Sequence, residues 1–528
     1  MSVSSLFIQL PHLAATMGVA WFVLASYRYI QRRSSVLGAV VALAILTRAA
    51  LGLGLFWTSY LGLPVAQSLQ AGGGFWQFAP DGGGYYQMAE SAARAWTLFP
   101  LDNSVPSPIY VNVLACWMMV CGISPAAGML LNLFLYTALV LAIVRTSKPV
   151  NDWRADLPCL VTVAAYSFAP AILLHSTQPL KDELSLAVVA AACFGVLKLR
   201  GLMHWPPASI NWAGGAAMIA VATFSAAGIR WYFACIICGA LAVTLGAFAV
   251  RGRTTPLPRY LGGSATVLLA AWLAFWGGAG PLYYLIAPSL WSIADVPSEL
   301  TNFTQMARIG FLSTPGNTSI RVPLTDDLAA GAARQAELRQ EQIDNPAYRE
   351  RARLAGLRQR QGAAAPVKVL PADQPPASQP KATGPDPLVL GIPTTMGEQG
   401  LGVALGIMTV FVPLTVIHAL TDITFGGGRG LLSLVDIDTL YLDATIFAVL
   451  LLLWQRRRMI GDRLPLVVFT LVLAGTTALL LGYVVTNFGT LWRLRPLFAL
   501  PLWLVTLAVS ARRDAAGPFA QADVGREG

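Results

Sequence analysis

Long apolar runs, separated by short groups of arginine and lysine, are the feature of this sequence that most constrains its fold. A helix that crosses the hydrocarbon core of a membrane needs about 20 apolar residues. Runs that approach or exceed this length recur along most of the chain. The candidate spans are residues 5–27, 35–60, 106–122, 125–145, 157–174, 183–199, 211–229, 231–250, 262–288, 401–424, 438–455, 463–485 and 495–511.

The composition leads to the same interpretation. Hydrophobic residues make up 55% of the 528 residues and charged residues only 12%, which is about half the charged share of a soluble protein. These values exclude a soluble enzyme, a nucleic-acid-binding protein and a disordered scaffold. The six cysteines lie within apolar runs, where thiols behave as small hydrophobic side chains, and we expect neither a disulfide framework nor a zinc site. We predict an all-α, polytopic integral membrane protein with about 11–13 transmembrane helices.

Basic residues at the ends of the apolar runs predict the orientation of the chain. Cytoplasmic loops are enriched in lysine and arginine, and groups such as Arg28–Arg33 and Arg456–Arg458 follow that pattern. The net charge of +10 is therefore assigned to topology and not to a nucleic-acid surface. The regions predicted to lie outside are 61–105, 175–182, Arg230 and 289–400.

The chain divides into four parts. Residues 1–288 form an N-terminal transmembrane bundle that includes the first outer loop 61–105. Residues 289–400 form a long outer loop, partly helical and partly rich in proline and alanine, which is expected to serve as a lid, a docking arm or a tether. Residues 401–511 are the C-terminal transmembrane segments, and 512–528 are a cytoplasmic tail. Surplus apolar runs in 106–145 and 401–455 leave the number of crossings open.

Polar residues that membrane insertion does not explain are the candidate functional residues. The first outer loop contains Asp81 among glycines, followed by Tyr85 and Tyr86. Asp81 is either the N-cap of a helix or a general base at the membrane surface, with the tyrosines available to stack on a sugar. The second group is Lys181-Asp182-Glu183. It is either an ordinary polar link or an anion site at the start of a helix.

Three further groups lie later in the chain. Arg230, with Trp231 and Tyr232, departs from the positive-inside trend and is a candidate phosphate ligand. Arg493 and Arg495 follow Asn487, and their guanidinium groups suit phosphate oxygens. Asp436 and Asp438 are weak candidates for a divalent cation, because a run of carboxylates is more often the first turn of a helix.

These short motifs together resemble the polytopic GT-C-type glycosyltransferases and the related bacterial exopolysaccharide polymerase-like membrane proteins. The resemblance covers most of residues 35–250 and 400–511. The motifs are Asp81 with Tyr85 and Tyr86, Ser107–Tyr110, Gly122–Pro125, Asn132, Ala169–Leu184, Asn487–Thr490 and Arg493–Arg495.

The resemblance implies transfer of a sugar from a polyprenyl-phosphate or -pyrophosphate carrier at the outer face of the bacterial cytoplasmic (inner) membrane, in cell-surface polysaccharide assembly. It implies that Asp81 is the base. A divalent cation is an optional cofactor, on the ground of Asp436 and Asp438 alone. The expected partners are the lipid-linked sugar, membrane lipid and other glycan-assembly proteins, and no nucleic acid. Two other functions stay open: export of lipid-linked glycans, and a non-catalytic subunit of an envelope assembly machine.

Overall fold

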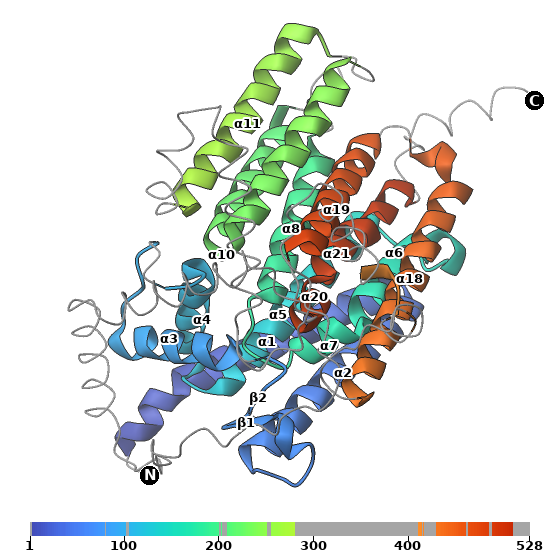
Figure 1. Cartoon of the computed structure of the whole chain (residues 1–528). Helices are drawn as coiled ribbons and strands as arrows, with labels where there is room; N and C mark the ends of the chain where they lie inside the picture. Colours follow the sequence, from blue (N-terminus) through green and yellow to red (C-terminus); the bar gives the residue numbers. More distant parts are fainter. Residues whose placement is uncertain are drawn as a thin grey trace, which may run out of the picture.

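The computed structural model describes residues 3–79, 81–101, 105–199, 202, 209–250, 255–279, 410–413, 416, 429–460, 463–484 and 488–510. Helices account for most of these residues, and many of them run side by side (Figure 1). The outer loop predicted at 289–400 and the tail at 512–528 lie outside the described residues, as does most of the run 401–424.

The N-terminal part begins with two long helices, α1 (Val3–Arg33) and α2 (Ser35–Tyr60). A short 3-10 turn (Gln67–Leu69) follows and leads into a small antiparallel ribbon of β1 (Gln70–Gly72) and β2 (Phe75–Trp76). The ribbon is pinned to α2, because Ser59 Oγ donates to the carbonyl oxygen of Phe75 at 2.7 Å. Helix α3 (Asp81–Ala95) starts directly after this ribbon.

Prolines set the starts of several of the next helices. Pro108 opens α4 (Pro108–Cys121), Pro125 opens α5 (Pro125–Ser147) and Pro170 opens α7 (Pro170–His175). Proline suits the first turn of a helix, where its missing N–H would have no partner. The single span predicted at 157–174 is therefore wrong. Pro170 cannot continue the helix before it, so the segment divides into α6 (Trp153–Phe168) and α7. Helix α8 (Asp182–Lys198) follows after a link.

Helix α10 (Ser209–Val250) is a hairpin of two helices. The backbone leaves helical geometry at Arg230, where φ is −150° and ψ is 82°. Cys238 forms a hydrogen bond with Thr223, although these residues would be about 22 Å apart on one continuous helix. The two halves are therefore antiparallel, and Arg230 lies at the reversal. This arrangement agrees with the separate runs predicted at 211–229 and 231–250.

The C-terminal helices complete the bundle. They are α11 (Leu257–Ala279), α18 (Arg429–Gln455), α19 (Leu464–Val484), α20 (Phe488–Leu494) and α21 (Pro496–Leu504), with 3-10 turns at Arg457–Met459 and Val505–Val509. Helix α21 contacts both α8 and α19 (Figure 1). It is buried along nearly its whole length, so the core of the described bundle lies around it.

Eight helical segments of the described part, with the α10 hairpin counted once, are long and apolar enough to cross a membrane, by length and composition. Many of their outer faces carry exposed large hydrophobic side chains, for example Trp21 and Phe447, as expected for surfaces that face lipid. The prediction of an all-helical, multi-pass membrane protein is confirmed at this level. The spans are Gln9–Arg33, Ser35–Tyr60, Pro125–Ser147, Trp212–Val250, Leu257–Gly278, Val435–Gln455, Leu464–Gly482 and Leu491–Val509.

Candidate functional site

Four segments that are far apart in the sequence bring five charged side chains together. Asp81 is the first residue of α3, Lys181 and Asp182 stand at the start of α8, Arg230 lies at the reversal of α10, and Arg493 belongs to α20. We call these five residues the charged cluster. Each was a candidate from the sequence, and contacts between them join the ends of helices from both halves of the chain.

A continuous series of ion pairs connects four members of the cluster. Arg493 Nη1 lies 2.9 Å from Asp81 Oδ2, and Arg493 Nε lies 3.1 Å from Asp182 Oδ2. The other carboxylate oxygen of Asp182 lies 2.6 Å from Arg230 Nη2. Asp182 is thus held between two guanidinium groups. The pairing is charge-assisted and largely shielded from solvent, which strengthens it.

Asp81 differs from the other members in its exposure. Its side chain is 48% exposed, whereas those of Arg493, Asp182 and Arg230 are 9%, 14% and 8% exposed. The half-exposed carboxylate therefore forms the accessible edge of a cluster whose cations lie behind it. A ligand that approaches from this side meets Asp81 first.

Lys181 takes part in the cluster without a carboxylate partner. Its Nζ donates to Ser107 Oγ at 2.6 Å and lies 5.4 Å from the centre of the Tyr85 ring. No described carboxylate forms an ion pair with it. Burial, followed by the positive charges of Arg230 and Arg493, lowers the pKa of the Lys181 amine to about 7. Near neutral pH this side chain exchanges between ammonium and amine forms.

Aromatic residues surround the cluster. The Tyr85 ring meets the Tyr110 ring edge-on at 5.2 Å, and the Tyr232 hydroxyl accepts a hydrogen bond from Arg230 Nη1 at 3.2 Å. The rings of Trp231 and Tyr232 lie 6.2 Å apart. Tyr86 packs against the β-ribbon instead, with its ring centre 5.5 Å from that of Phe75. Three of the four predicted aromatic residues therefore lie at or next to the charged cluster.

A small internal space adjoins the cluster on its buried side. His175, Asp182, Glu183 and Arg493 are among the residues that line it. Its volume of about 10 Å³ is close to the room that one water molecule requires. In the described conformation this space therefore holds no ligand larger than about one water molecule.

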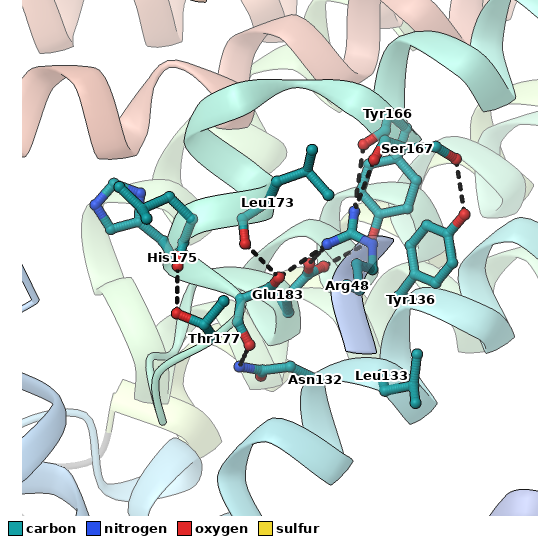
Figure 2. Close-up of polar contacts among 12 residues, drawn as sticks. Arg48, Asn132, Leu133, Tyr136, Tyr166, Ser167, Leu173, His175, Thr177 and Glu183 are labelled. Carbon is teal, nitrogen blue, oxygen red and sulfur yellow. Dashed lines mark hydrogen bonds and ion pairs between the residues drawn. The ribbon is translucent and has the colours of Figure 1, made fainter. Parts of the chain in front are cut away.

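Glu183 was predicted with Lys181 and Asp182 but contacts a different set of residues (Figure 2). Its Oε1 lies 3.3 Å from Arg48 Nη1 of α2, and its Oε2 accepts a hydrogen bond from the Tyr166 hydroxyl at 2.6 Å. Arg48 also donates to Ser176 Oγ at 2.9 Å and lies 4.1 Å from the centre of the Tyr136 ring. Arg48 and Glu183 are both almost fully buried. They hold the link between α7 and α8 from inside the bundle.

Arg495 likewise belongs to the interior. Its Nη1 lies 3.7 Å from Asp438 Oδ2 and donates to Thr439 Oγ1 at 2.6 Å. Asp438 Oδ1 accepts a hydrogen bond from the backbone N–H of Ala171 at 2.9 Å. Asp436 is also buried. Within the described residues, no three His, Cys, Asp or Glu side chains are grouped so that they could hold a metal ion.

Three residues need separate mention. Asn487 lies outside the described residues. Sequence reasoning missed Arg48, although an arginine inside the apolar run 35–60 is the kind of intramembrane charge that indicates a buried partner. It also passed over Ser107 as a functional side chain, because a lone serine before a proline carries no signal until its neighbours in space are known.

Gly128 of α5 allows the link before α8 to lie close to the bundle. A Cβ atom at this position would lie 2.5 Å from Pro179 Cβ and 2.9 Å from Pro179 Cα. We expect Gly128→Ala to displace the link and lower stability by roughly 1–3 kcal/mol, measured by thermal unfolding in detergent. Gly239→Ala is the matched control, because no atom lies within 4 Å of its added Cβ. Equal melting temperatures for the two variants would contradict this steric role.

Comparison of the chain with protein-family models, curated proteins and solved structures gave no match.

Proposed function

We propose that this protein is a membrane glycosyltransferase that uses a polyprenyl-phosphate- or pyrophosphate-linked sugar at the outer face of the bacterial cytoplasmic membrane, in assembly of a cell-surface glycan. The observation that carries the proposal is the charged cluster. It combines one accessible carboxylate, Asp81, with three cations at the end of a bundle of apolar helices. A lipid-linked phosphate requires cations near the membrane surface and an apolar surface for its chain.

Four members of the cluster have a role in this reaction. Asp81 accepts the proton of the attacking hydroxyl group, as a positioned carboxylate does in general base catalysis. Arg493 and Arg230 stabilise the negative charge that develops on the leaving phosphate. Before the substrate binds, Asp182 balances these two guanidinium groups and holds them in place. Tyr85, Tyr232 and Trp231 supply aromatic surface for the sugar or the lipid.

Asp81→Asn tests this assignment in cells that lack the chromosomal copy of the gene. The substitution keeps the size of the side chain but removes its capacity to accept a proton. We expect cells complemented with the variant to accumulate the same incomplete lipid-linked glycan as the deletion, detected by mass spectrometry. Glu90→Gln, on the same helix and paired with the exposed Arg94, is the control and should restore the normal profile. A normal profile with Asp81→Asn, at wild-type protein levels, would remove Asp81 from the reaction.

Export of a lipid-linked glycan is the second candidate, and a specific observation favours it. Two further cations, Arg48 and Arg495, are buried inside the bundle, and buried cations are a feature of phosphate-conducting paths. Both are already neutralised by carboxylates, Glu183 and Asp438, which fits a structural role better. A transporter would move the carrier across the membrane without changing its chemical composition, so product analysis separates the two functions.

A further inference from the structure

We propose that Ser107 is a nucleophile activated by Lys181, and that it takes an acyl group from an O-acyl ester to form an acyl-serine. This activity goes beyond the proposed sugar transfer and does not depend on it. It rests on the side-chain contacts of Ser107, on the backbone conformation of Ser107 and on the ionisation of Lys181.

The Ser107 hydroxyl is held by three groups from three segments. It accepts a hydrogen bond from Lys181 Nζ at 2.6 Å, donates to the carbonyl oxygen of Ile229 at 3.0 Å and is hydrogen-bonded to the Tyr85 side chain. A serine needs an adjacent base to become a nucleophile, and lysine serves as that base in Ser–Lys enzymes. A contact at 2.6 Å is within the distance for direct proton transfer.

The backbone at Ser107 is strained. Its φ of 58° and ψ of 57° lie in the left-handed region, and Pro108 follows immediately. This region is unusual for a residue other than glycine, and a residue before proline normally adopts an extended conformation. Residues held in such conformations cluster at functional sites. Sharp, strained turns of this kind present the serine nucleophile of other enzymes.

Lys181 can act as a base because its ammonium form is disfavoured. A lysine with the usual pKa near 10.4 is almost entirely protonated at neutral pH, whereas burial and the two arginines bring the pKa of this amine to about 7. The charged and titratable groups that face it come from four elements. They are Asp81 and Tyr85 of α3, Asp182 of α8, Arg230 of α10 and Arg493 of α20.

The same residues complete the reaction. When Lys181 is in its amine form, the Ser107 hydroxyl donates to its Nζ in place of the Ile229 carbonyl oxygen. The Ser107 proton then moves to the Lys181 amine as the bond from Oγ to the ester carbonyl carbon forms. The ester C–O bond then breaks, and the departing alkoxide takes the proton from Lys181. In the second half, an acceptor hydroxyl attacks the acyl-serine, Lys181 takes its proton, and Ser107 Oγ leaves with that proton. The acyl group is thus transferred from the ester to the acceptor hydroxyl, without an oxidant or reductant.

Tyr85 supplies a proton donor for the oxyanion of the tetrahedral intermediate, and Arg230 supplies a positive charge beside the ester. Burial raises the pKa of Tyr85 above its usual value, so its hydroxyl remains a proton donor toward the developing oxyanion. Arg230 follows Ile229, whose carbonyl oxygen already contacts Ser107. This cation favours an ester that also bears an anionic group, as membrane phospholipids do.

A fluorophosphonate probe, which reacts covalently with activated serines, tests the proposal on the full-length protein in detergent. We expect labelling at Ser107, located by mass spectrometry of the digested protein. The rate should rise about tenfold from pH 6 to pH 8 as Lys181 loses its proton. Ser107→Ala should abolish labelling at this position, and Lys181→Arg should lower the rate at least tenfold, because arginine stays charged.

Ser185→Ala is the matched control. Among the described residues its hydroxyl donates only to the backbone carbonyl oxygen of Lys181, at 2.9 Å, so labelling of Ser107 should persist at the wild-type rate. Ser107→Cys provides a second test in case the alanine variant misfolds. Its thiol should react with iodoacetamide faster when Lys181 is present than in the Ser107→Cys/Lys181→Met variant. An unlabelled Ser107 in the wild-type protein, or a rate that Lys181→Arg leaves unchanged, would overturn the proposal.

Discussion

Arg493→Met is expected to lower sugar transfer by about 10²–10³-fold, in line with the loss of one preorganised donor to a developing oxyanion. Arg493 is the only described cation that pairs with both Asp81 and Asp182. Without Arg493, the Asp81 carboxylate loses its ion-pair partner. In the proposed reaction, the leaving phosphate also loses one of the two guanidinium groups that stabilise it. The rate is measured as product formed by membranes that contain equal amounts of each variant.

Two variants make this result specific. Arg493→Lys keeps the charge but cannot bridge two carboxylates with a planar fork, so we expect partial activity. Arg94→Met removes an exposed arginine whose partner Glu90 lies one turn away on α3, and it should leave the rate within about twofold of wild type. Equal activity in Arg493→Met and Arg94→Met would show that the ion pairs of Arg493 are structural and not part of the reaction.

Arg48→Met is expected to give the largest loss of stability. The free energy of unfolding should fall by about 3–5 kcal/mol, because the buried Glu183 carboxylate loses the cation that neutralises it. The side chains of this pair are 4% and 3% exposed, so bulk solvent does not reach the unpaired carboxylate. Arg48 also stacks on Tyr136 and bonds Ser176. The loss is measured by thermal or denaturant-induced unfolding of the purified protein in detergent.

The double variant Arg48→Met/Glu183→Leu separates the unpaired charge from the lost packing. Replacement of both charged residues by apolar ones is often nearly neutral in a protein interior, so we expect most of the stability to return. Breaking the exposed pair with Arg94→Met should change stability by less than about 1 kcal/mol. A double variant as unstable as Arg48→Met alone would contradict the role of the unpaired Glu183 carboxylate.

Much of the fold and part of the site could be predicted from the sequence. The apolar runs predicted the helices, because one helix must hide all its backbone polar groups from lipid by itself. Five charged residues were identified because a charge next to an apolar run is costly unless it has a partner or a function. The structure brings the five together: Asp81, Lys181, Asp182, Arg230 and Arg493.

Pairing between distant segments could not be predicted. Asp182 and Glu183 are neighbours in sequence, yet successive side chains of a helix point about 100° apart, and the two residues therefore meet different arginines. Arg495 lies only two residues after Arg493 but is buried against Asp438, because the start of α21 turns into the bundle. The left-handed backbone at Ser107 depends on tertiary packing, and no local pattern indicates it.

The most direct test of the central proposal is reconstitution of the purified protein in liposomes with the lipid-linked glycan that accumulates in cells lacking the gene. Mass spectrometry would follow the glycan, its lipid carrier and the acceptor. The account predicts loss of the sugar-bearing carrier, release of the polyprenyl phosphate or pyrophosphate, and gain of the sugar mass on the acceptor, all absent with Asp81→Asn. Movement of the intact carrier across the bilayer, with no change in its mass, would contradict sugar transfer and support export.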